Sequence, residues 1–217
     1  MNFFLQSRAD VDSATKFMED NGYVTSGLSC KNWETYCVLP YLRDGNILDM
    51  GSSGSILLEN AVKKKLVGLK TGIDLEYPIN VGSPEGINLM RGDLMNTGLP
   101  DSLYDIVTSL SVLEHEVDYT SFAKEVSRLL KSGGSLFVSF DYAHERIDTS
   151  LTRLYSLRWN ILSKEDVIQL VQICKENGLE ITSEIDWTTD EMVINPAYCS
   201  PAQGVSYTFG ILHFIKK

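Results

Sequence analysis

The sequence predicts an α/β protein with a doubly wound, mostly parallel sheet of seven strands and helices on both faces. Along the 217 residues, short apolar runs alternate with stretches whose apolar residues recur at helical spacing. A Gly/Ser cluster follows the first of these runs, and aspartates follow several later ones. This alternation is typical of parallel strands connected by helices that cross the sheet.

The first expected elements are two helices, over 11–21 and 31–42. They belong to an N-terminal helical cap over 1–45, which we expect to act as a partial lid on a ligand site. Trp33 and Tyr36 in the second helix are candidates for covering a ligand. Aromatic packing in the core is the equal alternative for both side chains.

The first strand, over 46–50, runs into the turn Gly51-Ser52-Ser53-Gly54-Ser55, and a helix begins near Ile56. Glycine allows backbone to approach a ligand closely, and the start of a helix offers N–H groups without partners. The G-x-G-x-x-G dinucleotide pattern is incomplete, because Ser53 and Ile56 stand where glycines would be. Taken alone, the turn fits a plain strand-to-helix connection as well as a ligand loop.

The remaining elements continue the alternation. The expected strands cover 70–74, 86–90, 104–109, 135–140, 180–187 and 205–216, the last two as a hairpin-like antiparallel edge. The expected helices cover about 119–131, stopped by Gly133-Gly134, and a stretch opened by a capping box at 163–166 and ended by Gly178.

Composition restricts the class of protein. Apolar residues make up 43% and charged residues 22%, as in ordinary globular proteins, and no stretch approaches the ~20 apolar residues of a membrane span. The N-terminus does not resemble a signal peptide, so we expect a cytoplasmic protein with no membrane partner. The formal net charge is −10, with Lys63-Lys64-Lys65 as the one basic block, which disfavours a nucleic-acid partner.

The four cysteines form no CxxC pair and have no metal-site spacing. We therefore expect reduced, mostly buried thiols and no metal site. The cysteines are Cys30, Cys37, Cys174 and Cys199.

Two aspartates stand at expected strand ends, where ligands bind in this class of sheet. Asp74 ends the second strand, and its carboxylate can accept both hydroxyls of a ribose. Asp93 follows the third strand and can accept a hydrogen bond from an adenine amino group. A helix cap or solvated turn is the alternative for Asp74, and a turn residue for Asp93.

From about Asn46 to Tyr142 the chain resembles class I S-adenosylmethionine (SAM)-dependent methyltransferases, in particular the small-molecule branch with a Leu-Glu-His signature. The segments that carry the resemblance keep the order and spacing of the family; they are Asn46-Ile47-Leu48-Asp49-Met50-Gly51-Ser52, Gly72-Ile73-Asp74-Leu75, Gly92-Asp93-Leu94, Tyr104-Asp105-Ile106-Val107, Val112-Leu113-Glu114-His115 and Leu129-Leu130-Lys131-Ser132-Gly133-Gly134-Ser135-Leu136. The resemblance implies a Rossmann-like methyltransferase fold and SAM as cofactor.

The resemblance also implies roles for individual residues. Asp49 and Gly51 would shape the methionine end of the pocket, Asp74 would bind ribose and Asp93 adenine. One departure is that Ser53 and Ser55 replace two of the family's alternating glycines. The whole expected cofactor site is Asp49, Gly51, Ser52, Ser53, Gly54, Asp74, Leu75, Asp93, Leu94, Leu110 and Ser111, the last two through backbone contacts.

Catalysis of methyl transfer to an alcohol benefits from a general base with a pKa near neutrality, which suits histidine. His115 follows the fourth strand and Asp141 ends the fifth, so an Asp-oriented His115 base is one hypothesis. The alternative is a structural His115, while Glu114 is expected to set the turn. Arg153 and Arg158 are candidates for pairing with an acceptor carboxylate or phosphate; an amphipathic surface segment is the alternative.

The sequence therefore predicts a single domain over 1–217, with a SAM-binding core over 46–145 and a substrate-side segment with C-terminal strands over 146–217. The expected function is methyl transfer to a small molecule, with O-methylation of a sugar or hydroxylated metabolite as one form. A non-catalytic SAM-binding or scaffold domain and a dinucleotide-binding oxidoreductase are the alternatives. The sequence is compatible with a homodimer.

Overall fold

Strands and helices alternate along most of the chain in the computed structural model, which describes residues 1–79, 81–189, 191–197 and 204–217. The strands are β1 (Phe3–Phe4), β2 (Ile47–Met50), β3 (Lys70–Asp74), β4 (Asn88–Arg91), β5 (Tyr104–Leu110), β6 (Leu130–Tyr142), β7 (Arg153–Leu154), β8 (Leu157–Arg158), β9 (Leu179–Ile181) and β10 (Thr208–Lys216). The helices are α1 (Arg8–Asp20), α2 (Ser29–Val38), α3 (Leu57–Lys63), α4 (Tyr119–Leu129) and α5 (Lys164–Glu176), with a 3₁₀ turn η1 (Leu39–Tyr41) after α2.

The central sheet has eight strands, in the order β1-β10-β6-β5-β2-β3-β4, with β9 paired to β10. Neighbours from β6 to β4 are parallel, and β10 is antiparallel to β6, β1 and β9. All seven predicted strands are present, and the short β1 is the additional one. The chain runs from β2 outward to β3 and β4 and returns to β5 on the other side of β2, so the order reverses between β2 and β5. A doubly wound sheet binds ligands at this point.

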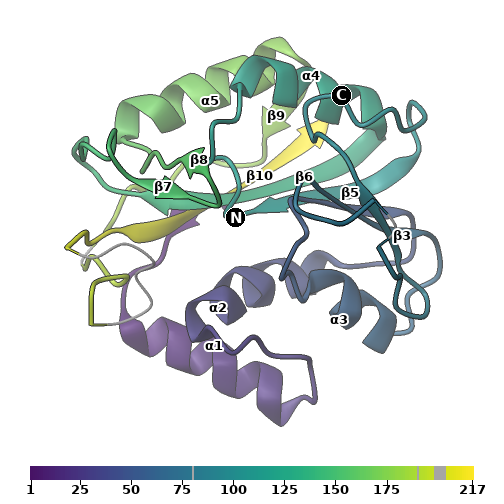
Figure 1. Ribbon diagram of the computed structural model, residues 1–217, viewed down its shortest axis with the longest axis horizontal. Helices are drawn as coiled ribbons and strands as arrows, with labels where there is room; N and C mark the ends of the chain where they lie inside the picture. The colour runs from purple at the N-terminus through teal and green to yellow at the C-terminus, as the bar shows by residue number, and fades with distance from the viewer. Residues whose placement is uncertain (80, 190, 198–203) are drawn as a thin grey trace.

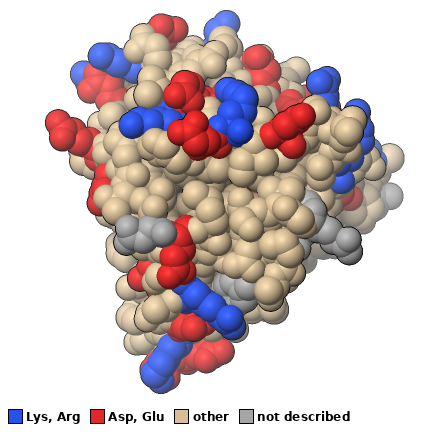
Figure 2. Space-filling model, turned by 90° about the vertical axis from the view of Figure 1, so that its left-hand side faces the viewer, with Lys and Arg blue, Asp and Glu red and all other residues tan. Residues whose placement is uncertain are grey.

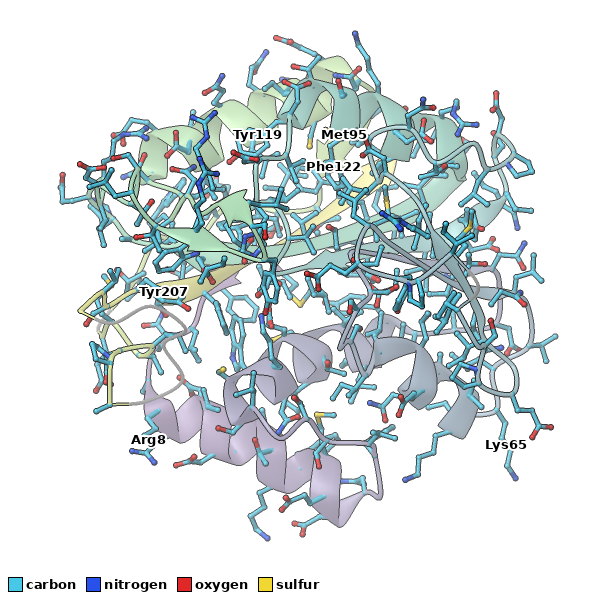
Figure 3. All side chains as sticks on the ribbon, in the orientation of Figure 1. Arg8, Lys65, Met95, Tyr119, Phe122 and Tyr207 are labelled. Atoms are coloured by element: carbon cyan, nitrogen blue, oxygen red, sulfur yellow. The ribbon has the colours of Figure 1, made fainter. Side chains whose placement is uncertain are left out.

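Helices cover both faces of the sheet, as predicted (Figure 1). α1, α2 and α3 lie on one face and α4 and α5 on the other, and each layer encloses its own cluster of buried apolar side chains. Figure 3 shows Phe122 of α4, together with Tyr119 and Met95, on the α4–α5 side of the sheet. Burial on both faces explains why β2 reads as a continuous apolar run apart from Asp49.

Local capping signals set several helix ends. Ser7 and Asp10 form a capping box at the start of α1, and Ser163 and Asp166 form the predicted one at the start of α5. The predicted helix over 31–42 is α-helical only to Val38, and Pro40 lies in the 3₁₀ turn that follows. Proline lacks the N–H that a continuing α-helix would use.

Three sequence-based boundaries differ from the structure. α4 ends at Leu129, and Gly133-Gly134 lie within β6, where the register with β5 shifts, so they do not stop the helix. β10 lies inside the sheet between β1 and β6, so the predicted edge position is wrong for this strand. Of the stretch 180–187, only the first residues pair as β9.

Cys30, Cys37 and Cys174 are buried, as expected, and none of these three forms a disulfide with another described residue. Burial raises the pKa of Cys174 to about 12. Cys199 lies outside the described residues. On the face shown in Figure 2, acidic and basic side chains are interspersed above and below an uncharged band. No helix in the described ranges is both long and apolar enough to cross a membrane.

Candidate active site

A cavity of about 540 Å³ opens at the carboxyl ends of β2, β3, β4 and β5, where the strand order reverses. Most of the predicted site residues line it: Gly51, Ser53, Gly54, Asp74, Leu75, Asp93, Leu94, Leu110, Ser111 and His115. Three predicted residues, Asp49, Ser52 and Asp141, are buried and do not line it. The topology therefore brings the strand-end residues to one cavity.

The turn after β2 depends on its glycines. Gly51 has a φ of 77°, and a Cβ there would lie 2.3 Å from a methyl group of Val112. Any larger residue would push this turn away from the loop after β5. Gly54 has a φ of 75°, and a Cβ there would meet no atom within 4 Å, so its backbone faces open space on the cavity wall.

Two aspartates shape the far side of the cavity. The Asp74 carboxylate accepts hydrogen bonds from the N–H of Ser53 (2.9 Å) and of Glu76 (2.7 Å), so it ties the glycine turn to the end of β3. Asp93 accepts one from the N–H of Met95 at 2.8 Å. The sequence left a turn role and a ligand-binding role open for each aspartate. In the structure both carboxylates accept hydrogen bonds within turns, and both also line the cavity.

Asp49 and Ser52 support the turn from below. The Asp49 carboxylate accepts a hydrogen bond from Thr108 Oγ1 at 2.7 Å, while its Oδ2 is buried without a partner in the described residues. Burial raises the pKa of Asp49 to about 6. Ser52 packs over Gly72, where a Cβ would lie 2.5 Å from its hydroxyl oxygen, and it lies within hydrogen-bond distance of Tyr77.

α2 supplies one wall of the cavity through residues that the sequence reasoning missed. Glu34 is buried, lines the cavity and accepts a hydrogen bond from Ser111 Oγ at 2.5 Å. Its neighbour Lys31 lies 3.3 Å away and also lines the cavity. The signal was available, because Glu34 sits on the apolar face of this helix with Cys30 and Cys37 one turn to either side.

Lys31 is surrounded by buried carboxylates. Burial disfavours its charged form, but Glu34, Asp141 and Glu114 outweigh that effect and raise the pKa of Lys31. Burial also disfavours the charged form of the acids. It raises the pKa of Asp141 to about 7 and that of Glu114 well above its usual range. Glu114 Oε2 has no partner among the described residues. The cluster therefore retains protons near neutral pH.

The predicted pairing of His115 with Asp141 is not formed. Asp141 accepts a hydrogen bond from the indole Nε1 of Trp159 at 2.6 Å, and the Nδ1 atom of His115 has no partner in the described part of the chain. His115 lines the cavity with its ring edge-on to Tyr155, at 5.4 Å between centroids. Burial, aided by Lys31, lowers the pKa of His115 to about 4, so the ring is neutral at pH 7.

The hairpin formed by β7 and β8 closes one side of the cavity. Tyr155 and Leu157 line the cavity from this hairpin. Arg153 and Arg158 instead pair with Glu116, at 3.7 and 2.8 Å, and neither lines the cavity. The hairpin is thus fixed beside His115 by ion pairs at its base, and its guanidinium groups are already occupied.

The two aromatic candidates for a lid have other positions. Trp33 is buried in the core and packs against Phe3 and Phe209. Tyr36 packs edge-on against Phe17 at the outer side of the helices. Trp33 therefore packs in the core and Tyr36 near the surface, and neither lines the cavity. In the described ranges no cluster of three or more His, Cys, Asp or Glu side chains is arranged to hold a metal ion.

Residues 48–138 match the family model described as a methyltransferase domain. The chain is 41% identical over 86 residues to demethylmenaquinone methyltransferase of Staphylococcus epidermidis, covering 37% of this chain and 35% of that protein. It is 32% identical over 102 residues to ubiquinone biosynthesis O-methyltransferase of Aeromonas salmonicida, covering 43% of this chain and 42% of that protein. The match thus spans less than half the length of these relatives.

Solved structures show the same fold. An S-adenosylmethionine dependent methyltransferase from Mesorhizobium loti superposes with a TM-score of 0.58 at 17% identity, over 86% of this chain and 98% of the other. The 4+2 cyclase SpnF superposes with a TM-score of 0.63 at 17% identity, over 96% and 94%. Residues 48–138 thus match a methyltransferase domain, and the fold of the chain is that of SAM-dependent methyltransferases of class I.

The residues present fit the family's cofactor. The cavity offers the open backbone of Gly54, two carboxylates at neighbouring strand ends, and a buried carboxylate oxygen of Asp49 that lacks a partner nearby. SAM carries two cationic groups, two ribose hydroxyls and an adenine amino group, which are the partners such carboxylates require.

Proposed function

We propose that the protein transfers a methyl group from SAM to a small-molecule acceptor bound beside His115. The observation that supports this most directly is the composition of the single cavity at the strand reversal. The glycine turn with Asp74 and Asp93 lines it, and so do His115 and Tyr155. Residues suited to bind the cofactor and residues suited to bind the acceptor therefore line the same cavity. Direct methyl transfer requires the two bound molecules to lie this close together.

When bound, SAM supplies the methyl group on an activated sulfonium. On this proposal Asp74 accepts the ribose hydroxyls and Asp93 the adenine amino group, with Leu75 and Leu94 flanking the base. Ser53 and Gly54 offer backbone to the cofactor where the Gly54 wall is open. Residues 46–145 form the cofactor core, while α2 and the β7–β8 hairpin, from 1–45 and 146–217, complete the cavity.

The environment of His115 restricts the chemical class of acceptor. A neutral imidazole can accept a proton, but a base with a pKa of about 4 removes protons efficiently only from acidic hydroxyls. A phenolic or enolic hydroxyl fits this base better than a sugar hydroxyl does. The Aeromonas relative is a ubiquinone biosynthesis O-methyltransferase, which agrees with methylation on oxygen.

The test is a turnover assay with methyl-labelled SAM and a panel of phenolic, enolic and sugar acceptors. We expect label transfer to a phenolic or enolic acceptor. His115→Ala should reduce turnover by at least about 100-fold, the usual contribution of a general base, while SAM affinity stays nearly unchanged. His144→Ala is the matched control, because His144 is exposed and does not line the cavity. Unchanged turnover in His115→Ala would exclude the base role.

A second candidate function is SAM binding without methyl transfer. The superposition on SpnF favours it, because a protein described as a 4+2 cyclase shares this fold. In that case SAM would bind in calorimetry while no acceptor in the panel took up label. Binding of NAD in place of SAM would instead indicate an oxidoreductase.

A further inference from the structure

Glu34 is a buried carboxylate on the cavity wall that lies outside the segment matched by the methyltransferase family, residues 48–138. Two serine hydroxyl groups, one just after β5 and one in the neighbouring strand β6, donate hydrogen bonds to its Oε1 atom. These are Ser111 Oγ, just after β5, and Ser139 Oγ, within β6. Its other oxygen lies 3.3 Å from Lys31 Nζ. Both of its oxygens are therefore engaged by fixed partners.

Ser111 is the residue that these contacts restrain. It has a φ of 53°, in the left-handed region that costs a residue other than glycine about 1 kcal/mol or more. Its N–H donates to both the hydroxyl (3.0 Å) and the carbonyl (3.1 Å) of Ser139, and its own hydroxyl donates to Glu34. Such a conformation persists where surrounding contacts determine it, and these three contacts do so here.

Leu110 and Ser111 line the cavity beside the glycine turn, because Gly51 packs against the next residue, Val112. We propose that Glu34 is a positioning residue for the cofactor, which acts by holding Ser111 in its left-handed conformation. This inference rests on the proposed function, since it assumes that the backbone at Leu110 and Ser111 contacts SAM. It makes α2 a working part of the cofactor site.

A purely structural role for Glu34 makes a different prediction. If Glu34 only anchors α2 to the sheet, removing it should lower stability whatever residue stands at position 111. If it acts through Ser111, its effect on SAM binding should depend on that residue. Glycine adopts a positive φ without strain, so Ser111→Gly should make the site largely independent of Glu34.

The experiment is a double-mutant cycle read by calorimetry with SAM, using wild type, Glu34→Ala, Ser111→Gly and the double variant. Glu34→Ala leaves two hydroxyls and an ammonium without their acceptor, and we expect it to raise the SAM Kd about tenfold. In the Ser111→Gly background the same substitution should raise the Kd by less than about threefold. Glu34→Gln, which keeps an acceptor oxygen for the hydroxyls, should rescue most of the affinity and covers the case in which Glu34→Ala fails to fold.

Glu19→Ala is the matched control, an exposed helix glutamate on α1, and should leave the Kd unchanged. The inference is overturned if Glu34→Ala raises the Kd equally in both backgrounds, or if it leaves the Kd unchanged. It is also overturned if Glu34→Gln binds as weakly as a folded Glu34→Ala. Wild type that does not bind SAM would refute the proposed function itself, whereas wild-type binding with an unchanged Glu34→Ala refutes only the role of Glu34.

Discussion

At the scale of single residues, the protons held by buried acids near Lys31 distinguish the surroundings of the cavity. Asp141 and Glu114 lie close enough to Lys31 to raise its pKa, yet burial raises their own pKa values. The folded protein therefore keeps protons that the unfolded chain releases near pH 4. Because the folded state binds more protons than the unfolded chain, its stability falls as the pH rises. A carboxylate with a lowered pKa has the opposite effect.

Asp141→Asn tests this directly. The pKa of Asp141 is raised from 3.8 to about 7, so between these values the folded state binds more protons and wild-type stability falls as the pH rises. An asparagine oxygen can still accept the Trp159 hydrogen bond, and its neutral side chain removes the cost of ionisation. The variant should be more stable than wild type at pH 8, by up to about 4 kcal/mol, and the gain should shrink at pH 4. Urea unfolding at both pH values measures it.

Asp166→Asn is the opposite-sign control. Burial works to raise the pKa of Asp166, but Ser163 and Arg146 outweigh it and lower the pKa. This carboxylate adds stability above its unfolded pKa and loses it as the pH falls, so the variant should be less stable at pH 8. An Asp141→Asn protein that is less stable at pH 8 than at pH 4, relative to wild type, would contradict the assignment.

At the scale of elements, the β7–β8 hairpin combines a strained tip with a fixed base. Tyr155 and Ser156 both have positive φ, 54° and 65°, so they form the two-residue turn that favours Asn-Gly. Glu116 pairs with Arg153 and Arg158 at the other end of the hairpin. The contact of Tyr155 with His115 is thus maintained by a turn whose residues do not favour it.

Ser156→Gly should therefore stabilise the protein. Removing the left-handed strain is worth about 1 kcal/mol, which corresponds to roughly 2–4 °C in Tm for a chain of this size. Ser150→Gly, in the same exposed segment but without a positive φ, should leave the Tm unchanged or lower it. Differential scanning calorimetry compares the two variants. A lower Tm for Ser156→Gly would show that the turn is not strained.

The sequence predicted elements better than contacts. Strands β2, β3, β4 and β5 were predicted to within about two residues, because apolar runs are local properties, whereas β6 begins at Leu130, five residues before its predicted start. Gly133-Gly134 were misassigned because the irregularity in β6 arises from its pairing with β5. Glu34 was missed, and Asp141 was paired with the wrong partner, for a related reason. Their partners, Ser111 and Trp159, are distant in sequence, and the direction of a side chain at a strand end is not encoded in the pattern.

At the scale of the whole molecule, the cavity is lined by residues inside and outside the segment that matches the methyltransferase family. The family match over 48–138 contains the glycine turn and the strand-end residues up to His115. The opposite walls come from α2 and from the β7–β8 hairpin, both outside that match. The cofactor can therefore be inferred from the matched segment, whereas the acceptor depends on the β7–β8 hairpin, which that segment does not include.

The central claim is that the cavity at the strand reversal binds SAM through Asp74. Calorimetry of the wild type and of Asp74→Ala with SAM tests it most directly, with NAD as the competing ligand. We expect one SAM per chain, no binding of NAD, and at least about a tenfold weaker Kd for the variant, because two hydrogen bonds from ribose hydroxyls lose a charged acceptor. Equal SAM affinity in the two proteins, or no SAM binding by the wild type, would contradict the account.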